Sequence, residues 1–274
     1  MVYMKQILRK LRVILILPLI YVGLHLAFRP WSKNVAPSVI AHRGAAGLAP
    51  ENTQAAIRAG IQHKADFIEV DIQRSADDVL IVIHDQTVDR TTDGHGAVVD
   101  LTWAEISQFE AGSYFGPEYA GETVPRLDSV LEMTKGTAST WFIEIKEPHL
   151  YPGIEQQIAE TIQNAQAQDQ VTIISFDYES LRKFSELMPN VPLGFISKYP
   201  ITLPKIAKHQ SVDVLWLSVI LDPTLVRRLH NQGHQVWVWT IDNWLIIRLL
   251  IWLGVDGITT NRPDLFNTIP GATG

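Results

Sequence analysis

Residues 39–72 read VIAHRGAAGLAPENTQAAIRAGIQHKADFIEVDI, and this stretch contains a complete strand–helix–strand pattern. The apolar runs VIAH (39–42) and FIEVDI (67–72) have the composition and length of buried strands. Between them, ENTQAAIRAGIQH has apolar residues at helical spacing, and Asn52 is placed as its cap. Strands joined by a helical crossover run parallel, so the stretch predicts one unit of an α/β protein.

The same alternation continues to the end of the chain. Helical patterns separate most of the apolar runs, and the runs themselves are nearly continuous, as in parallel strands covered on both faces. Nine strand candidates fit a (β/α)8 TIM barrel with one to spare, and a doubly wound sheet is the second choice. The later candidates are VLIVIH (79–84), WFIEIK (141–146), VTIISF (171–176), PLGFIS (192–197), DVLWLS (213–218), QVWVWTI (235–241) and DGITT (256–260).

Two places interrupt this rhythm inside the predicted barrel domain, residues 38–270. The stretch between FIEVDI and VLIVIH is too short for a helix, so the chain is expected to return in extended form. After the third strand, residues from about 86 to 126 precede the next clear helix. A loop of that length usually has a role, and we expect this insertion to cap the strand ends.

Composition excludes several classes of function. The formal net charge of −6 argues against nucleic acid as a partner. The chain has no cysteine, which excludes disulfides, zinc–thiolate sites and thiol nucleophiles. Neither feature indicates a compartment or an oligomeric state.

Residues 1–34 differ from the rest of the chain. A basic segment precedes the uncharged run VILILPLIYVGLHLAF (13–28), and Arg29 and Lys33 follow it. As a helix the run would span roughly 24 Å, and snorkelling arginines extend that reach. We favour a retained transmembrane anchor, since the nearest cleavage-like sequence, NVA (34–36), is followed by proline. A cleaved signal peptide and a buried helix are the alternatives.

The charge excess before this run predicts the topology. Positive residues favour the cytoplasmic side, so the N-terminus is expected there and the main domain on the opposite, periplasmic or extracytoplasmic side. If the segment is cleaved instead, the domain is secreted.

Carboxylates gather on two of the predicted strands. Strand side chains alternate in direction, so Glu69 and Asp71 share one side of FIEVDI, and Glu144 and Lys146 share one side of WFIEIK. In a barrel that side is the interior, near the mouth. Three converging carboxylates repel one another unless a cation lies between them, which predicts a Ca²⁺, Mg²⁺ or Mn²⁺ site. The alternative is a set of solvated or salt-bridged strand ends.

Two histidines end predicted strands in the same way. His42 closes VIAH and His84 closes VLIVIH, and together they could share acid and base duties at neutral pH. Arg43 and Lys146 supply the positive charge that a phosphate needs. A lone histidine at such a position is usually structural, but the pair beside three carboxylates favours a phosphate-processing site.

These segments resemble the glycerophosphodiester phosphodiesterase family of phospholipase C-like barrels. The similarity follows HRGAAGLAPENT, ADFIEVDIQRSADDVLIVIHDQTVDRTTDGHG, FIEIK, VWVWTID and GVDGITTNRP in order, from about residue 39 to 266. The combination is specific, although each motif alone would be weak. The resemblance is to a membrane-anchored, bacterial-type member.

The resemblance implies a function and roles for residues. It implies metal-dependent hydrolysis of glycerophosphodiesters to glycerol 3-phosphate and an alcohol, through a cyclic phosphate. His42 and His84 would be the acid–base pair, with neither role assigned to either residue. The other implied roles are metal binding for Glu69, Asp71 and Glu144, phosphate binding for Arg43 and Lys146, and a glyceryl contact for Trp239.

Two residues near these motifs have an alternative role, and one dipeptide departs from the family pattern. Trp239 could instead belong to the barrel core, and Asn52 is read as a helix cap rather than as support for the site. The family usually has Thr-Asp where this chain has Thr260-Asn261. We expect that difference to affect only local loop chemistry.

The motifs do not identify the headgroup of the substrate. The last helical stretch, NWLIIRLLIWLG (243–254), narrows the class of substrate instead. Leu245, Leu249 and Trp252 are predicted to face the core. Trp244, Ile247 and Ile251, beside Arg248, would then face outward and suit a membrane interface. A dimer contact or cover by the N-terminal segment would also explain them.

A membrane interface makes lysophospholipids alternative substrates, by lysophospholipase D-type hydrolysis to lysophosphatidic acid. Two rival functions remain on the same scaffold. One is a catalytically silent lipid-binding barrel, and the other is a phospholipase D-like enzyme acting on sphingolipids.

Overall fold

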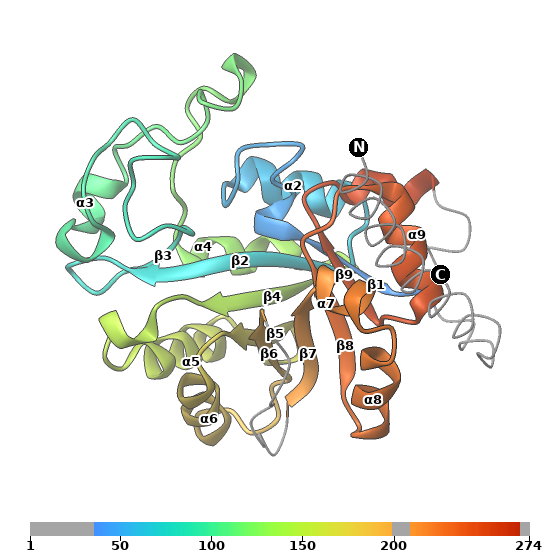
Figure 1. Ribbon diagram of the computed structural model, residues 1–274. Helices are drawn as coiled ribbons and strands as arrows, with labels where there is room; N and C mark the ends of the chain where they lie inside the picture. The colour runs from blue at the N-terminus through green and yellow to red at the C-terminus, as the bar shows by residue number, and fades with distance from the viewer. Residues whose placement is uncertain (1–35, 199–208, 269–274) are drawn as a thin grey trace, which may run out of the picture.

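The computed structural model describes residues 36–198 and 209–268 (Figure 1). The predicted N-terminal basic segment and membrane helix, residues 1–34, lie outside the described residues. Within the described ranges, none of the helices combines the length and the apolar character needed to cross a membrane.

Eight parallel strands form a closed barrel, which confirms the predicted fold class (Figure 1). Pairing runs from β1 through β9, β8, β7, β6, β5 and β4 to β2, and β2 pairs back with β1. The ninth candidate strand, β3 (Leu80–Val82), pairs antiparallel with the end of β2 and stands outside the barrel. The barrel strands are β1 Ser38–Ala41, β2 Phe67–Arg74, β4 Thr140–Ile145, β5 Val171–Ser175, β6 Leu193–Ser197, β7 His209–Leu215, β8 Gln235–Trp239 and β9 Gly257–Thr260.

The barrel interior is filled by large apolar side chains below the mouth. Ile40, Phe142, Ile174, Ile196 and Trp237 form one buried cluster, and the Phe142 and Trp237 rings stack at 4.9 Å. Along β2 and β4 the inward positions change from apolar to acidic toward the carboxyl ends, where Asp71 pairs in register with Glu144. The strand period therefore carries the acids to the open end of the barrel.

Helices cover the outside of the barrel, and side-chain caps begin several of them. Thr53 caps α2 by accepting from Ala56 N, so the cap is Thr53 and the prediction that Asn52 serves as the cap is wrong. The α-helices are α2 Gln54–Gln62, α3 Trp103–Ile106, α4 Leu127–Leu131, α5 Ile154–Asn164, α6 Tyr178–Leu187, α7 Trp216–Leu221, α8 Leu225–Asn231 and α9 Trp244–Leu253. Short 3₁₀ turns are η1 His42–Gly44, η2 Val98–Asp100, η3 Pro117–Tyr119, η4 Glu132–Thr134, η5 Pro148–Leu150, η6 Gln168–Gln170 and η7 Pro263–Thr268.

Two sequence predictions about the C-terminal half are wrong. The predicted strand DVLWLS (213–218) ends at Leu215, and α7 begins at Trp216. On α9 the buried residues are Ile247, Leu250 and Leu253. The predicted core residues Leu245, Leu249 and Trp252 are exposed instead, together with Trp244. Apolar residues occur all round this helix, so periodicity could not say which side packs on the barrel.

The segment between β3 and α4 forms a lobe beside the mouth (Figure 1, left). It has a small hydrophobic core of its own, made of Ile81, Ile83, Val88, Val98, Ile106, Ala111 and Val124. Its far end is tied to the loop after β1 and to α2, since the Tyr119 hydroxyl donates to Leu48 O and Arg58 of α2 pairs with Glu122. These links hold the lobe over the β1 and β2 strand ends.

Candidate active site

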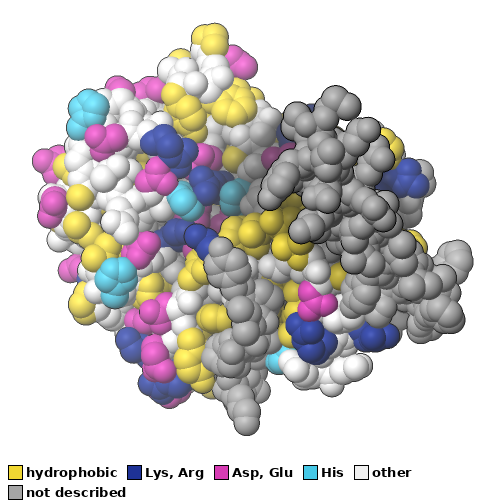
Figure 2. All heavy atoms as spheres, viewed as in Figure 1, with side chains coloured by type: hydrophobic (Ala, Val, Ile, Leu, Met, Phe, Trp, Pro, Cys, Tyr) yellow, Lys and Arg dark blue, Asp and Glu magenta, His cyan; other side chains and the backbone are white. Residues whose placement is uncertain are grey.

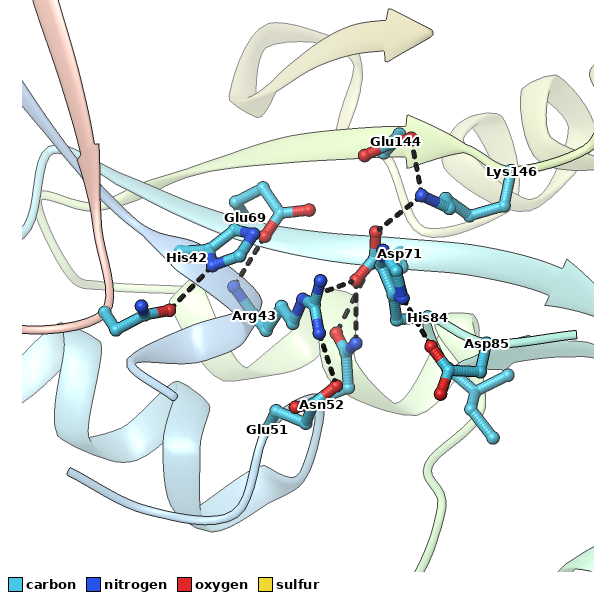
Figure 3. Close-up of polar contacts among 12 residues, drawn as sticks. His42, Arg43, Glu51, Asn52, Glu69, Asp71, His84, Asp85, Glu144 and Lys146 are labelled. Carbon is cyan, nitrogen blue, oxygen red and sulfur yellow. Dashed lines mark hydrogen bonds and ion pairs between the residues drawn. The ribbon is translucent and has the colours of Figure 1, made fainter. Parts of the chain in front are cut away.

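The turn after β1 carries His42 and Arg43 into the mouth (Figure 3). Arg43 N donates to Glu69 Oε2 at 2.5 Å, which ties this turn to β2. Gly44 has φ +88°, and a Cβ there would lie 2.7 Å from Ile57 N in α2. The H-R-G sequence thus combines two functional side chains with the one residue that lets the turn pack against α2.

The three predicted metal-binding carboxylates meet at the open end of β2 and β4. Glu69, Asp71 and Glu144 are buried, and one oxygen from each lies within 4.8 Å of the others. Glu69 Oε1 and Asp71 Oδ1 have no hydrogen-bond partner among the described residues. Buried carboxylate oxygens left in this way fit a hard cation, because oxygen donors are what Ca²⁺, Mg²⁺ and Mn²⁺ prefer.

Crowding shifts the protonation of these acids. Burial, and then the charges of Asp71 and Glu144, raise the pKa of Glu69 well above its usual value. Burial and Asp71 raise the pKa of Glu144 to about 7, against the opposing effect of Lys146. The pKa of Asp71 is lowered although burial opposes this, because Lys146, His84 and Arg43 favour its anion. When all three carboxylates are ionised, their negative charge therefore exceeds the positive charge of Arg43 and Lys146.

Arg43 and Lys146 lie on either side of Asp71 (Figure 3). Lys146 Nζ is 2.9 Å from Glu144 Oε1 and 3.7 Å from Asp71 Oδ1, and Arg43 Nε is 3.7 Å from Asp71 Oδ2. Both side chains line the same cavity as the histidines. A phosphate in this cavity would meet a guanidinium and an ammonium at once.

His42 is held by an asparagine from the other end of the sequence. His42 Nδ1 lies 2.7 Å from Asn261 Oδ1, and Asn261 Nδ2 donates to Asp242 Oδ2 at 2.7 Å. A carboxylate only accepts, so the amide nitrogen of Asn261 must face Asp242 and its oxygen must face His42. Nδ1 of His42 therefore carries the proton. The expectation that Asn261 affects only local loop chemistry is wrong.

Burial, followed by the positive charge of Arg43, lowers the pKa of His42 to about 4. At neutral pH this imidazole is uncharged, with Nδ1 protonated and Nε2 free to accept a proton. That is the state a general base requires.

His84 has a charged partner instead of a neutral one. Its Nδ1 lies 2.6 Å from Asp85 Oδ1, and Arg90 Nε donates to Asp85 Oδ2 at 2.6 Å. The Arg90 hydrogen bond is the main reason that the pKa of Asp85 lies well below its usual range. Arg90 also makes two hydrogen bonds to Glu51, which in turn accepts from Arg43 at 2.7 Å. The turns that carry His42 and His84 thus share one ion-pair network.

Two buried amides brace this arrangement. Asn52 Nδ2 donates to Asp71 Oδ2 at 2.8 Å, and Asn52 itself adopts φ +58°, which asparagine tolerates. Gln73 Nε2 donates to the carbonyls of Ile83, His84 and Asp85, and the Tyr151 hydroxyl donates to Gln73 Oε1. Asn52 orients a predicted metal ligand, and Gln73 fixes the turn that presents His84.

One cavity of about 620 Å³ opens at the strand ends and contains both histidines. Figure 2 shows basic, acidic and histidine side chains gathered beside a hydrophobic surface. The hydrophobic part of the cavity comes from β5 to β8 and includes Ile174, Phe176, Ile196 and Trp239. The Trp239 ring meets Phe176 edge-on at 5.7 Å, and its Nε1 donates to Asp213 O at 3.0 Å. Trp239 is therefore a wall residue of the cavity, whereas Trp237 belongs to the core.

Asp213 is a buried acid on this hydrophobic side. Burial raises its pKa to about 7, opposed only by the nearby Ser211 hydroxyl. Across the described part of the chain, neither carboxyl oxygen has a hydrogen-bond partner. Its isolation sets it apart from the acids of β2 and β4.

All eight predicted site residues surround this cavity: seven line it, and Asp71 lies behind it bonded to Asn52, Arg43 and Lys146. The sequence motifs contained most of the supporting residues without revealing their roles. Asp85 and Arg90 lie within HDQTVDRTT, Glu51 and Asn52 within PENT, and Asp242 within VWTID. The only sequence signal for these supporting residues was that polar residues recur after the ends of the predicted strands.

Comparisons with known proteins agree with this geometry. The model of the glycerophosphoryl diester phosphodiesterase family matches residues 42–265. A glycerophosphodiester phosphodiesterase from Caldanaerobacter subterraneus subsp. tengcongensis is 37% identical over 231 residues, covering 82% of this chain and 94% of that protein. One from Bacillus subtilis is 34% identical over 250 residues, covering 84% and 85%.

Solved structures give the same result. A glycerophosphodiester phosphodiesterase from Agrobacterium tumefaciens is 31% identical with a TM-score of 0.73, covering 84% of this chain and 99% of that one. An Oleispira antarctica phosphodiesterase in complex with the product sn-glycerol-3-phosphate is 27% identical with a TM-score of 0.78, covering 85% and 96%. The chain therefore belongs to the glycerophosphoryl diester phosphodiesterase family.

Proposed function

We propose that this protein hydrolyses glycerophosphodiesters to glycerol 3-phosphate and an alcohol. The observation that carries the proposal is the convergence of two differently held histidines, three buried carboxylates and two cations on one cavity. That set matches what phosphodiester cleavage requires: a proton acceptor, a proton donor and positive charge for the phosphate. The names of the relatives point to the same substrate class.

Glu69, Asp71 and Glu144 would hold one divalent cation, Ca²⁺, Mg²⁺ or Mn²⁺. The buried oxygens Glu69 Oε1 and Asp71 Oδ1, which have no hydrogen-bond partner among the described residues, support this assignment. When bound, the cation supplies Lewis-acid stabilisation of charge on the phosphate oxygens. Arg43 and Lys146 flank the same position and would bind the phosphate, the arginine through two donors and the lysine as a point charge.

His42 is assigned as the general base. Its Nδ1 proton is committed to Asn261, so Nε2 is the atom that takes the proton from the attacking oxygen. That oxygen belongs either to water or to a hydroxyl of the substrate's own glyceryl group. A neutral amide partner beside Arg43 keeps the imidazole uncharged until the proton arrives.

His84 is assigned as the general acid. The Asp85 carboxylate accepts from Nδ1 and interacts favourably with the imidazolium form, and Arg90 fixes that carboxylate in place. Nε2 of the imidazolium then gives its proton to the leaving alkoxide as the phosphorus–oxygen bond breaks. If the first step forms a cyclic phosphate, the two histidines exchange roles while water opens it.

Turnover of glycerophosphocholine, measured with EDTA and with added Ca²⁺ or Mg²⁺, tests the reaction and the cation together. The expected products are glycerol 3-phosphate and choline, and activity should return only with the cation. Full activity after complete chelation would remove the cation from the mechanism. Absence of turnover with every glycerophosphodiester under cation-replete conditions would overturn the reaction itself.

A substrate whose leaving group needs no proton distinguishes the roles of the two histidines. His42→Ala and His84→Ala should each lower turnover of glycerophosphocholine by about 10²–10⁴-fold. With a p-nitrophenyl ester of glycerol phosphate, turnover by His84→Ala should return close to that of the wild type, whereas turnover by His42→Ala should stay low. Recovery in His42→Ala alone would reverse the assignment, and near-wild-type activity of both variants would contradict it.

Lysophospholipids are a second class of substrate, and the hydrophobic side of the cavity favours it. Phe176 is 44% exposed there and lies against Trp239, so an acylated glyceryl group would find apolar surface next to the phosphate site. The product would be lysophosphatidic acid. Turnover of lysophosphatidylcholine relative to glycerophosphocholine, with product identification, decides between the two classes.

A membrane-anchored enzyme is also part of the proposal. The basic segment and apolar run within residues 1–34 support an anchor with a cytoplasmic N-terminus and a periplasmic or extracytoplasmic barrel. Protease digestion of intact and permeabilised cells tests this topology. Digestion of the barrel only after the inner membrane is opened would overturn it.

A further inference from the structure

Exposed apolar residues are concentrated on two neighbouring helices. Among the described residues, six of the eleven exposed large hydrophobic side chains lie on α7 and α9, which contact each other. They are Leu217, Leu221, Trp244, Leu245, Leu249 and Trp252, and we call them the α7/α9 face. An exposed apolar patch of this kind marks an interaction surface.

The exposed residues of α9 form one continuous side of the helix. Trp244, Leu245, Leu249 and Trp252 lie on this side, while Ile247, Leu250 and Leu253 are buried on the opposite side. Leu245 is the most exposed residue on this side of α9, with a relative exposure of 61%. An outer barrel helix normally presents polar residues here, so core packing does not explain the face.

The chemistry of the face fits a lipid surface. Arg248 is exposed on the same side, and its guanidinium lies 5.5 Å from the centre of the Trp244 ring. The helix sequence WLIIRLLIWL has no acidic residue. Tryptophan, leucine and arginine on one side of a helix are the combination that lies at the boundary between headgroups and acyl chains.

The path of the chain brings the same side of the barrel toward a bilayer. Ser38 N donates to Asp256 O at 2.8 Å, so β1 begins beside the turn that follows α9. Nine residues, 29–37, separate Ser38 from the apolar run 13–28, and they span at most about 30 Å. A membrane-inserted run would therefore hold the end of α9 near the membrane surface.

We propose that the α7/α9 face lies on the surface of a lipid bilayer that contains anionic lipids. Because α9 runs back along the barrel from the end of β8 to the start of β9, the barrel axis then lies along the membrane. The mouth opens sideways, with its β8 rim and Trp239 close to the lipid. For lysophospholipid turnover this inference rests on the proposed function, but the docking itself does not.

A single cysteine tests the contact directly, because the native chain contains none. Leu249→Cys, in the full-length chain reconstituted in phosphatidylethanolamine–phosphatidylglycerol vesicles, is labelled with a polarity-sensitive dye. Leu187→Cys on α6 is a matched control, since Leu187 is 36% exposed and Leu249 is 38% exposed. The expected result is a blue-shifted dye at position 249, quenched by doxyl-labelled lipids, and a dye at position 187 quenched by iodide.

Every other result overturns the proposal. Iodide quenching of both dyes would mean that the face is open to water. A dye at position 249 that neither quencher reaches would mean that protein covers the face. Dependence of that protection on the protein-to-lipid ratio would then identify a second copy, and independence would identify residues 13–28 of the same chain.

Activity provides a second readout that separates docking from catalysis. Leu245→Ser/Leu249→Ser should leave turnover of dissolved glycerophosphocholine unchanged and lower turnover of lysophosphatidylcholine in vesicles about fivefold or more. Equal turnover of the vesicle substrate by variant and parent would count against docking. Failure of the parent to hydrolyse either substrate would instead contradict the proposed function, and the dye result would still stand.

Discussion

The two sides of the barrel mouth are built from different kinds of residue. The side formed by β1, β2, β4 and the turn after β3 is charged, and nearly every side chain there is bound to another, as Asp71 is to Asn52. The side formed by β5 to β8 is mainly apolar, with Phe176 and Trp239 as its walls. Ser175, Asp177 and Lys198 also line this side, and Asp213 has no side-chain hydrogen-bond partner among the described residues. Both sides are formed by the carboxyl ends of parallel strands of one barrel, so backbone geometry does not account for the difference.

The difference between the two sides indicates that the charged side carries the chemistry and the apolar side the selectivity for substrate. A cross-linked set of charged groups is costly to disturb, because each group left behind is buried without its partner. An apolar wall acts through shape and area, so a change there should alter binding more than turnover. Each variant below tests that division, from the largest expected effect to the smallest.

Glu69→Gln should have the largest effect, on the charged side. Removing one carboxylate weakens cation binding and should lower kcat/KM by about 10³-fold. Because the substitution also relieves repulsion among buried acids, the melting temperature in EDTA should stay the same or rise. Calorimetry with and without Ca²⁺ or Mg²⁺ checks this. An undiminished stabilisation by the cation would show that Glu69 is not a ligand.

Asn261→Asp should have an intermediate effect, through His42. An anionic partner favours the imidazolium, so the pKa of His42 should rise from its value of about 4. The base must be uncharged to act, so the acid limb of the kcat/KM profile should move to higher pH. Asn261→Ala, which removes the partner, should lower kcat about tenfold without that upward shift. Identical pH profiles for the wild type and Asn261→Asp would contradict the role given to Asn261.

Trp239→Leu should have a smaller effect, on the apolar side. Loss of the aromatic wall should raise KM about five- to tenfold, while kcat stays within about threefold. Phe176→Leu is the matched variant, because that ring contacts Trp239. Steady-state kinetics on glycerophosphocholine provide the measurement. A large fall in kcat with unchanged KM would place Trp239 in the chemistry and break the division between the two sides.

Asp213→Asn should change stability more than activity. Burial raises the pKa of Asp213 to about 7 in the folded protein, above its unfolded value, so the folded state binds a proton more tightly. The wild type should therefore lose stability as the pH rises from about 4 to 7, and the variant should not show this loss. At pH 8 the variant should be more stable by about 2–4 kcal/mol. Denaturant unfolding at pH 5 and pH 8 measures the difference, and equal pH dependence would contradict it.

Much of the fold and the reacting groups could be predicted from the sequence. Side chains along a strand alternate with a period of two, so Glu69 and Asp71 of FIEVDI must share one side, and Glu144 of WFIEIK faces the same barrel interior. The strand–helix alternation indicated at which end of the barrel that interior opens. His42 and His84 were recognisable because each closes an apolar run. These features are local, and a local pattern is enough to define them.

Contacts between distant residues could not be predicted in this way. His42 meets Asn261 across 219 residues, and the Arg90–Glu51 pair joins the lobe to the turn after β1. Asn52 appeared to be a helix cap because its bond to Asp71 exists only when α2 packs beside β2. The side of α9 that faces the barrel was also undetermined, since apolar residues occur all round the helix.

The sequence by itself determined the barrel and the set of groups that meet at its mouth. Only the tertiary structure decided that His42 has a neutral partner and His84 an anionic one, and this difference supports the proposal that His42 accepts the proton. The physical reason is that periodicity and chain order are properties of neighbouring residues. The protonation state of a histidine depends on the groups that closure of the barrel brings against it.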